Sequence, residues 1–347
     1  MKIFIRADGG KDIGLGHVMR MLVLGEELKK TNDVIFICRN SISDKFEAGI
    51  KKIKEKSFKV IEISEEDYIR EIIEMQTKHN ADVLITDSYD IDEEYFIKLK
   101  KYFRFTGYVD DVNKCKMDVD FIVNQNINAR DLNYEDNINS STKLFLGTQY
   151  CMIRDEFREA YKSKVIKKEI QDILLTLGGM DNNNNTLKIL EKIKDINKKL
   201  HVVIGSAFDK ELIEKIQDIT KRHNNIYIYE NVNMAQLMLK CDVAISACGS
   251  TLYELAAMSV PTIGIVLAEN QKFVAEKMKE MNLIFECFEI RAIEKINLLV
   301  LLNELIEDEM LRENVIEKQK ALVNLYGVES LVEEINGIIR GKNYDEY

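Results

Sequence analysis

The sequence contains no apolar run of the roughly 18 residues that a membrane-spanning helix needs, and residues 1–14 lack the apolar core and cleavage site of a signal peptide. It also lacks an excess of positive charge, because 49 Lys and Arg residues face 59 Asp and Glu residues, for a net charge of −10. A general nucleic-acid-binding protein needs a basic surface. We therefore expect a cytoplasmic protein with no nucleic-acid partner and no stable membrane insertion. The sequence leaves the oligomeric state open, and a monomer is the simplest expectation.

Disulfide and metal signatures are missing as well. None of the six cysteines forms a Cys-x-x-Cys pair, and most lie in apolar stretches, as is typical of buried thiols in a reducing compartment. The four histidines show no metal-ligand spacing. We accordingly expect neither a metal site nor a cofactor.

The sequence does contain an alternation of short apolar runs and amphipathic stretches, which is typical of parallel sheets covered by helices on both faces. A charged stretch at 155–171, expected to be helical, separates two such halves. The pattern predicts an α/β protein with two Rossmann-like domains, residues 1–155 and 170–325, and a ligand crevice between them. Residues 326–347 are expected to form a C-terminal helix packing back on the first domain. The expected strands are 2–6, 34–38, 59–63, 83–86, 105–110, 121–124, 173–177, 201–205, 226–229, 243–246 and 262–266.

The segment Gly14-Leu15-Gly16-His17 follows the first expected strand. A dinucleotide-binding fingerprint would need glycine at position 19, where Met19 stands, and the strand lies too far from the glycine pair. An NAD site is therefore not expected. An imidazole beside a glycine turn at the carboxyl edge of a sheet can act as a general base near pH 7, although a histidine at a helix start is often structural.

A second segment, 246–254, links a strand to a helix in the second half. Gly249, Ser250 and Thr251 can present backbone N–H groups and hydroxyls at the helix start, which suits a diphosphate. Glu254 has two interpretations. It completes a capping box with Thr251, or its carboxylate accepts from the two hydroxyls of a ribose. The sequence leaves both open.

Further polar or glycine-rich turns follow other expected strands. In the second half these are the turn at Gly179 and the pair Asn270 and Gln271, of which Asn270 could equally cap the next helix. In the first half, polar loops follow expected strands at 87–89, 110–111 and 124–126, and each alone is only a weak indication of a ligand site. Three arginines near these loops could offset phosphate charge, and spacing does not choose among them: Arg6, Arg20 and Arg154.

Taken in order, these motifs resemble those of the UDP-sugar hydrolases of pseudaminic acid biosynthesis and, more broadly, SpsG-type polysaccharide biosynthesis proteins and MurG-like glycosyltransferases. The resemblance covers residue 1 to about residue 285. It rests on R-A-D at 6–8, G-x-G-H-V-M-R at 14–20, D-S-Y at 87–89, D-D at 110–111, N-Q-N at 124–126, L-G-x-x-Y at 146–150, G-G-x-D at 178–181, G-S-T-x-Y-E at 249–254 and A-x-N-Q at 268–271.

This resemblance implies a GT-B fold with the active site in the interdomain cleft. It also implies metal-free, inverting hydrolysis of the anomeric C–O bond of UDP-2,4-diacetamido-2,4,6-trideoxy-β-L-altrose to UDP and free sugar. His17 would be the base that activates water. The implied substrate- and UDP-binding residues are Asp8, Gly14, Gly16, Tyr89, Asn126, Gly179, Gly249, Ser250, Thr251, Glu254, Asn270 and Gln271.

The chain departs from the family pattern at three positions. Cys248 and Ser259 stand where the family usually has glycine, and Tyr253 stands where it often has tryptophan. A cysteine side chain at position 248 needs room or a different turn. Two alternative functions remain: a GT-B glycosyltransferase that passes the sugar to an acceptor, and a non-catalytic nucleotide-sugar-binding protein. A nucleotide-sugar epimerase shares the fold but matches these motifs less well.

Overall fold

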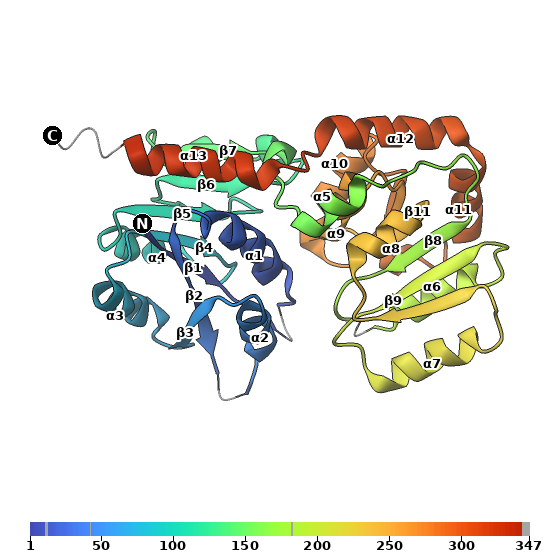
Figure 1. Cartoon of the computed structure of the whole chain (residues 1–347), viewed down its shortest axis with the longest axis horizontal. Coiled ribbons are helices and arrows are strands. Elements are labelled where there is room, and N and C mark those ends of the chain that lie inside the picture. The colour runs from blue at the N-terminus through green and yellow to red at the C-terminus, as the bar shows by residue number, and fades with distance from the viewer. Residues whose placement is uncertain (11–12, 42, 182, 342–347) are drawn as a thin grey trace. The chain divides into compact units, whose positions relative to one another are not determined.

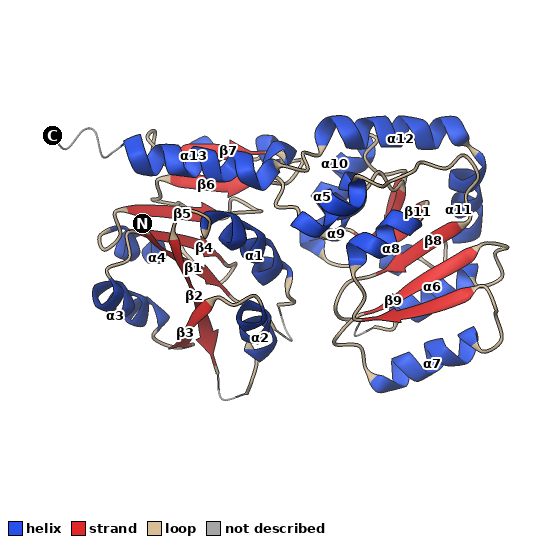
Figure 2. Cartoon of the chain, viewed as in Figure 1, coloured by secondary structure: helices blue, strands red, loops and turns tan. Residues whose placement is uncertain are grey.

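The computed structural model describes residues 1–10, 13–41, 43–181 and 183–341. The chain divides into two compact units, one formed by residues 1–152 and 326–347 and the other by residues 153–325. Each contains one parallel sheet with helices around it (Figures 1 and 2). The α/β fold class predicted from the alternating pattern is therefore confirmed. Within the described ranges, no helix is both long and apolar enough to cross a membrane.

Unit 1 contains a seven-stranded sheet with the order β3-β2-β1-β4-β5-β6-β7. Its strands are β1 (Lys2–Ala7), β2 (Asp33–Asn40), β3 (Lys59–Ser64), β4 (Val83–Asp87), β5 (Phe105–Val109), β6 (Phe121–Asn124) and β7 (Lys143–Leu146). Its helices are α1 (Gly16–Leu28), α2 (Glu47–Glu55), α3 (Tyr68–His79), α4 (Glu93–Lys100) and α13 (Gly327–Gly341), with short 3₁₀ turns η1 (Ala129–Asp131), η2 (Tyr134–Asp136) and η3 (Thr148–Tyr150).

Both faces of this sheet are buried, because successive side chains of a strand point to opposite sides. In β1, Ile3 and Ile5 face a core shared with α1, α2 and α13, whereas Phe4 faces a separate core shared with α3 and α4. Helix α13 contributes one apolar stripe to the first core and packs against α1 and η3. The last six residues of the expected C-terminal helix, 342–347, lie outside the described residues.

Unit 2 contains a six-stranded sheet with the order β10-β9-β8-β11-β12-β13. Its strands are β8 (Asp172–Thr176), β9 (Lys199–Ile204), β10 (Ile226–Glu230), β11 (Val243–Ala247), β12 (Thr262–Val266) and β13 (Glu286–Glu289). Its helices are α5 (Asp155–Tyr161), α6 (Asn185–Ile193), α7 (Lys210–Thr220), α8 (Met234–Lys240), α9 (Thr251–Ala257), α10 (Lys272–Glu280), α11 (Leu298–Glu307) and α12 (Glu309–Leu322), with 3₁₀ turns η4 (Glu269–Gln271) and η5 (Ile290–Ala292).

Each sheet reverses its strand order at one place. In unit 1, β1 lies between β2 and β4, and in unit 2, β8 lies between β9 and β11. In open α/β sheets, ligands bind outside the carboxyl ends of the strands at such a switch point. The loops that follow β1, β4, β5 and β6, and those that follow β8, β11 and β12, therefore line the candidate sites.

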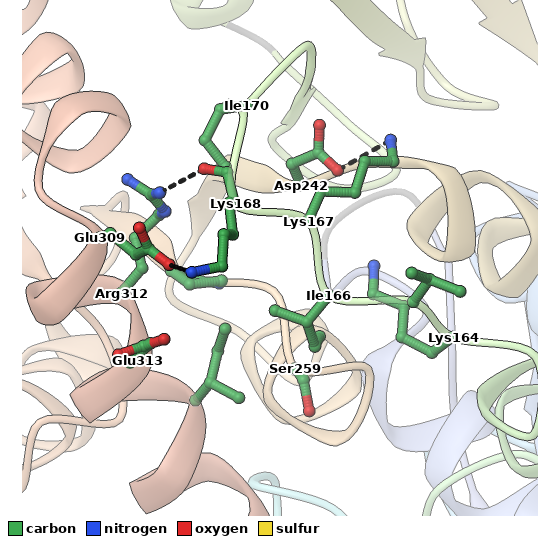
Figure 3. A pocket seen from close by; sticks show the side chains of 13 residues that line it. Lys164, Ile166, Lys167, Lys168, Ile170, Asp242, Ser259, Glu309, Arg312 and Glu313 are labelled. Atoms are coloured by element: carbon green, nitrogen blue, oxygen red, sulfur yellow. Dashed lines mark hydrogen bonds and ion pairs between the residues drawn. The ribbon is translucent and has the colours of Figure 1, made fainter.

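The prediction of a helix over residues 155–171 is wrong beyond Tyr161. Helix α5 ends at Tyr161, and the chain then continues without regular structure to β8. Tertiary contacts override the helical pattern: the Lys164 ammonium donates to three backbone carbonyls at the end of α8, at 2.8–3.3 Å. Lys167 pairs with Asp242 at 3.0 Å, and the carbonyl of Lys168 accepts from Arg312 (Figure 3).

This extended segment lines a pocket of about 230 Å³ together with residues of α12 (Figure 3). The pocket lies beside Ile170, Asp242 and Pro261, which precede β8, β11 and β12. It is therefore at the amino ends of these strands, opposite the edge where the sequence motifs gather.

The strands β7 and β13 were not expected from the sequence. Both are edge strands of only four residues, which is too short for a clear strand pattern.

Candidate active site

His17 lies in the first turn of α1, directly above the end of β4. Its Nδ1 is 2.6 Å from Oδ1 of Asp87, the last residue of β4. The two residues are 70 positions apart in sequence, and they meet because β1 and β4 are neighbours in the sheet. An ionised carboxylate only accepts hydrogen bonds, so Nδ1 carries the proton and Nε2 of the neutral ring is left as the basic nitrogen. The His17 side chain is 12% exposed.

Arg20, one turn further along α1, holds two carboxylates at once. Its Nε and Nη2 donate to Asp87 at 2.6 and 2.7 Å, and its Nη1 and Nη2 donate to Asp111 at 2.8 and 2.9 Å. The guanidinium thus holds both oxygens of Asp87 and shares Oδ1 with His17. The sequence did not select Arg20, Asp87 or Asp111 as site residues. The available signal was a histidine and an arginine three positions apart, with carboxylates at the ends of two later strands.

Two residues selected from the sequence join the same cluster. Tyr89 donates its hydroxyl to Oδ2 of Asp111 at 2.5 Å, and its ring meets the His17 ring edge-on, with the ring centroids 4.6 Å apart. Asn126 donates its amide to Oδ1 of Asp111 at 2.7 Å. The structure therefore brings His17, Tyr89 and Asn126 together around Asp87, Asp111 and Arg20.

Burial and ion pairing set the protonation of this cluster. Burial lowers the pKa of His17, but the charge and hydrogen bond of Asp87 outweigh it, so that the pKa lies above its usual value of 6.5. Burial raises the pKa of Asp87, and the charges of Arg20 and His17 reverse this, leaving the pKa far below its usual range. The cluster therefore favours an ionised Asp87, and it favours the protonated form of His17 more than water does.

Asp8 lies in a different cluster from His17. Its Oδ1 accepts from the backbone N–H of Arg39 at 2.7 Å, and its Oδ2 accepts from the side chain of Arg39 at 2.8 Å. The Arg6 guanidinium is 3.7 Å away and stacks on the ring of Tyr68. The R-A-D motif thus forms a buried ion-pair cluster, and Arg6 is too deeply buried to meet a phosphate.

The glycines before His17 shape an open turn. Gly10 and Gly14 exchange two backbone hydrogen bonds of 2.9 Å, and Gly14 has φ +72°, a conformation that favours glycine. A Cβ on Gly14 or Gly16 would meet no protein atom within 4 Å among the described residues. This turn is therefore accessible to a ligand at the backbone level.

In unit 2, the predicted nucleotide-binding loops follow three adjacent strands, β8, β11 and β12. Gly178 has φ +97°, and a Cβ on Gly179 would meet no described protein atom within 4 Å. Gln271 anchors the loop after β12, because its Oε1 accepts from the Leu267 N–H at 2.9 Å. Asn270 and Ser250 are exposed, and Thr251 begins α9.

The capping-box interpretation of Glu254 is wrong. The N-cap of α9 is Ser250, and it makes no side-chain capping bond. Oε1 of Glu254 instead accepts from Arg154, at 3.0 Å from Nε and 2.9 Å from Nη2. Arg154 thus pairs with one carboxylate and Arg20 with two. Because these carboxylates are distant in sequence, the spacing of residues alone did not show what either arginine binds.

Two of the departures from the family pattern have structural accommodations. A Cβ placed on Gly264 would lie 2.7 Å from Sγ of Cys248, so a missing side chain on β12 makes room for the cysteine. Ser259 has φ +53°, the left-handed conformation that glycine adopts most easily. Its hydroxyl lies 3.1 Å from that of Tyr161.

Comparisons with known proteins agree with this architecture. Residues 174–326 match the family described as Glycosyltransferase family 28 C-terminal domain. The fold resembles the crystal structure of MurG from Acinetobacter baumannii with a TM-score of 0.67 and 12% sequence identity, covering 97% of this chain and 99% of that one. The chain therefore has a GT-B-like fold.

Relatives of this protein in sequence confirm the resemblance inferred from its motifs. It is 29% identical over 278 residues to a Campylobacter jejuni subsp. jejuni protein named UDP-2,4-diacetamido-2,4,6-trideoxy-beta-L-altropyranose hydrolase, covering 79% of this chain and 95% of that protein. It is 33% identical over 285 residues to an uncharacterized protein of Methanocaldococcus jannaschii, covering 78% of this chain. The matched region spans 56% of the length of that archaeal relative.

Proposed function

We propose that this GT-B protein is a UDP-sugar hydrolase acting on UDP-2,4-diacetamido-2,4,6-trideoxy-β-L-altrose in pseudaminic acid biosynthesis. The observation that carries the proposal is the His17–Asp87 pair, clamped by Arg20, at the switch point of unit 1. A basic imidazole nitrogen held by a buried carboxylate is the arrangement that a water-activating base requires. The name of the C. jejuni relative supports the choice of substrate.

In the proposed reaction, Nε2 of His17 removes a proton from water, and the water oxygen bonds to the anomeric carbon. The anomeric C–O bond breaks at the same time, and its electron pair leaves with UDP. Attack on the face opposite the leaving group inverts the anomeric configuration. UDP is a good leaving group, so a strong general acid is not essential. The proton on His17 is then lost to solvent.

In the proposed binding mode, unit 1 supplies the base and the sugar contacts at Tyr89 and Asn126. The loops of unit 2 at Gly179, Gly249, Ser250 and Thr251 bind the diphosphate through backbone N–H groups. Glu254 accepts from the ribose, and Asn270 and Gln271 lie near the phosphates. These roles rest on the motif resemblance and on the position of the loops at the carboxyl ends of adjacent strands.

The test is UDP release from the UDP-linked diacetamido sugar without any acceptor, for the wild type and His17→Ala. A general base contributes about 10²–10⁴-fold, so the substitution should raise the barrier by about 3–5 kcal/mol. Proton NMR of the sugar product, recorded early, should show the inverted anomer. UDP binding without release in the wild type would overturn the hydrolase proposal for this sugar.

A GT-B glycosyltransferase is the second candidate, and the match of residues 174–326 to a glycosyltransferase domain favours it. A transferase would release UDP only when an acceptor hydroxyl is added. A non-catalytic nucleotide-sugar-binding protein would bind UDP equally well after loss of His17 and release nothing under either condition.

A further inference from the structure

Arg154 contacts Glu254, the residue that accepts hydrogen bonds from the ribose in the proposed function. Both Nε and Nη2 of Arg154 converge on Oε1 of Glu254, at 3.0 and 2.9 Å. Among the described residues, no protein group donates to Oε2. The arginine therefore occupies one carboxylate oxygen and leaves the second for a ligand.

Arg154 is itself held in place. It is the N-cap of α5, its guanidinium lies 4.8 Å from the centre of the Phe157 ring, and its Nη1 is 2.6 Å from Oε1 of Glu156. Helix α5 packs against α8 and α9. The arginine thus belongs to the same packed group of helices as Glu254, and its approach to the carboxylate is preorganised.

Arg154 favours the charged form of Glu254. The side chain of Glu254 is 17% exposed, and burial raises its pKa, with a smaller contribution from Glu156 in the same direction. Arg154 opposes both effects. Arg154 and Glu156 are therefore the charged groups, among the described residues, that set the state of Glu254.

We infer that Arg154 is a positioning residue that makes the nucleotide site selective for ribose over deoxyribose, by holding Glu254 as an oriented carboxylate with one oxygen free. This inference rests on the proposed function. A hydrogen bond to an ionised acceptor is roughly twice as strong as one between neutral groups. Loss of the 2′-hydroxyl removes one of the two donors that the ribose offers to that charged acceptor, and a site built for a hydroxyl discriminates strongly against a ligand that lacks it.

The test compares the dissociation constants of UDP and 2′-deoxy-UDP by calorimetry between pH 5 and pH 8. The phosphates of the two ligands titrate alike, so the ratio of the two dissociation constants measures the contribution of the 2′-hydroxyl alone. For the wild type we expect 2′-deoxy-UDP to bind on the order of 10- to 100-fold more weakly near pH 8. The ratio should fall at acidic pH, where Glu254 becomes protonated.

Arg154→Met keeps the aliphatic stem over Phe157 and removes the charge. We expect the fall in the ratio to move to higher pH in this variant, because nothing then offsets the burial of Glu254. Arg154→Lys should stay near the wild type. Arg158→Met is the matched control, since it removes an arginine of the same helix that pairs with Asp155. Circular dichroism of each variant checks folding.

The outcomes separate this inference from the function on which it rests. If Arg154→Met shows the same ratio and the same pH dependence as the wild type, Arg154 has only a structural role and the inference is overturned. If the wild type itself does not distinguish the two ligands, and Glu254→Gln binds UDP as the wild type does, the assignment of Glu254 to the ribose fails first.

Discussion

The exchange Asp87→Asn tests the central pair with almost no change in shape. In the native protein, Oδ1 of Asp87 accepts from His17 and Arg20, and Oδ2 accepts from Arg20. An asparagine supplies one oxygen and one NH₂ group. If its oxygen takes the Oδ2 position, against Nε of Arg20, its NH₂ group takes the Oδ1 position and faces Nδ1 of His17, so Nδ1 must give up its proton and accept. The proton then resides on Nε2, which can no longer act as a base.

The expected loss is the general-base contribution of His17. That contribution is about 10²–10⁴-fold in kcat, or roughly 3–5 kcal/mol at 1.36 kcal/mol per tenfold. The sign of the pH effect follows from the pKa shift. Asp87 raises the pKa of His17, and the base acts only when neutral. The native rate should therefore rise as pH increases through a value above 6.5. Without the carboxylate, burial lowers the pKa, and any residual rate should reach its plateau at lower pH.

The assay is UDP release at saturating substrate from pH 5 to pH 9, with the His17 ring followed by NMR titration in the free protein. Asp90→Asn is the matched control, because Asp90 lies three residues away, pairs with Arg39 and is half exposed. It should change neither the rate nor the titration. Retention of more than a third of the activity by Asp87→Asn, with an unchanged His17 titration, would refute the reasoning.

Two further predictions concern unit 2. Gly264→Ala should destabilise the protein by about 1–3 kcal/mol, because the new Cβ would lie 2.7 Å from Sγ of Cys248. The apparent Tm should recover when Cys248→Ala is added. Additive effects of the two exchanges on Tm would contradict the explanation. His201 is buried between Asp172 and Tyr229, at 2.8 and 2.9 Å, and burial lowers its pKa despite the raising effect of Asp172. The pKa of His201 is therefore lower in the folded protein than its value of about 6.5 in the unfolded chain. The unfolded chain then binds the proton more readily, so the free energy of unfolding should fall as the pH drops below that value. The exchange His201→Gln should flatten the dependence of Tm on pH between 7 and 5. Parallel curves for the two proteins would exclude His201 as the cause.

Local patterns predicted much of the fold. Runs such as 34–38 and 83–86 are largely apolar on both faces, and a sheet covered on both sides buries such a run. The glycine turn at 14–16 and the strand-to-helix turn at 249–251 also follow from local chemistry, since each depends on adjacent residues. For the same reason the family resemblance, which rests on short motifs in a fixed order, was recognisable without coordinates.

The errors arose where a distant contact outweighed a local pattern. Residues 162–171 have a helical composition, but Lys164 donates to carbonyls 74 to 77 positions away, and the segment has no regular structure. Thr251 and Glu254 have capping-box spacing, but Arg154, 100 positions earlier, takes the carboxylate. A charged side chain satisfies its hydrogen bonds with whichever partner the fold brings near.

The sequence by itself determined the α/β class, the two parallel sheets, the turns at their carboxyl edges and the family resemblance. Only the tertiary structure decided which charges meet. Asp87 and Asp111 lie 67 and 91 positions after Arg20, and they converge on it because the strand order places β4 beside β1 and β5 beside β4. Strand order depends on how long-range pairings bury the apolar faces of whole elements, so no local window of sequence contains it.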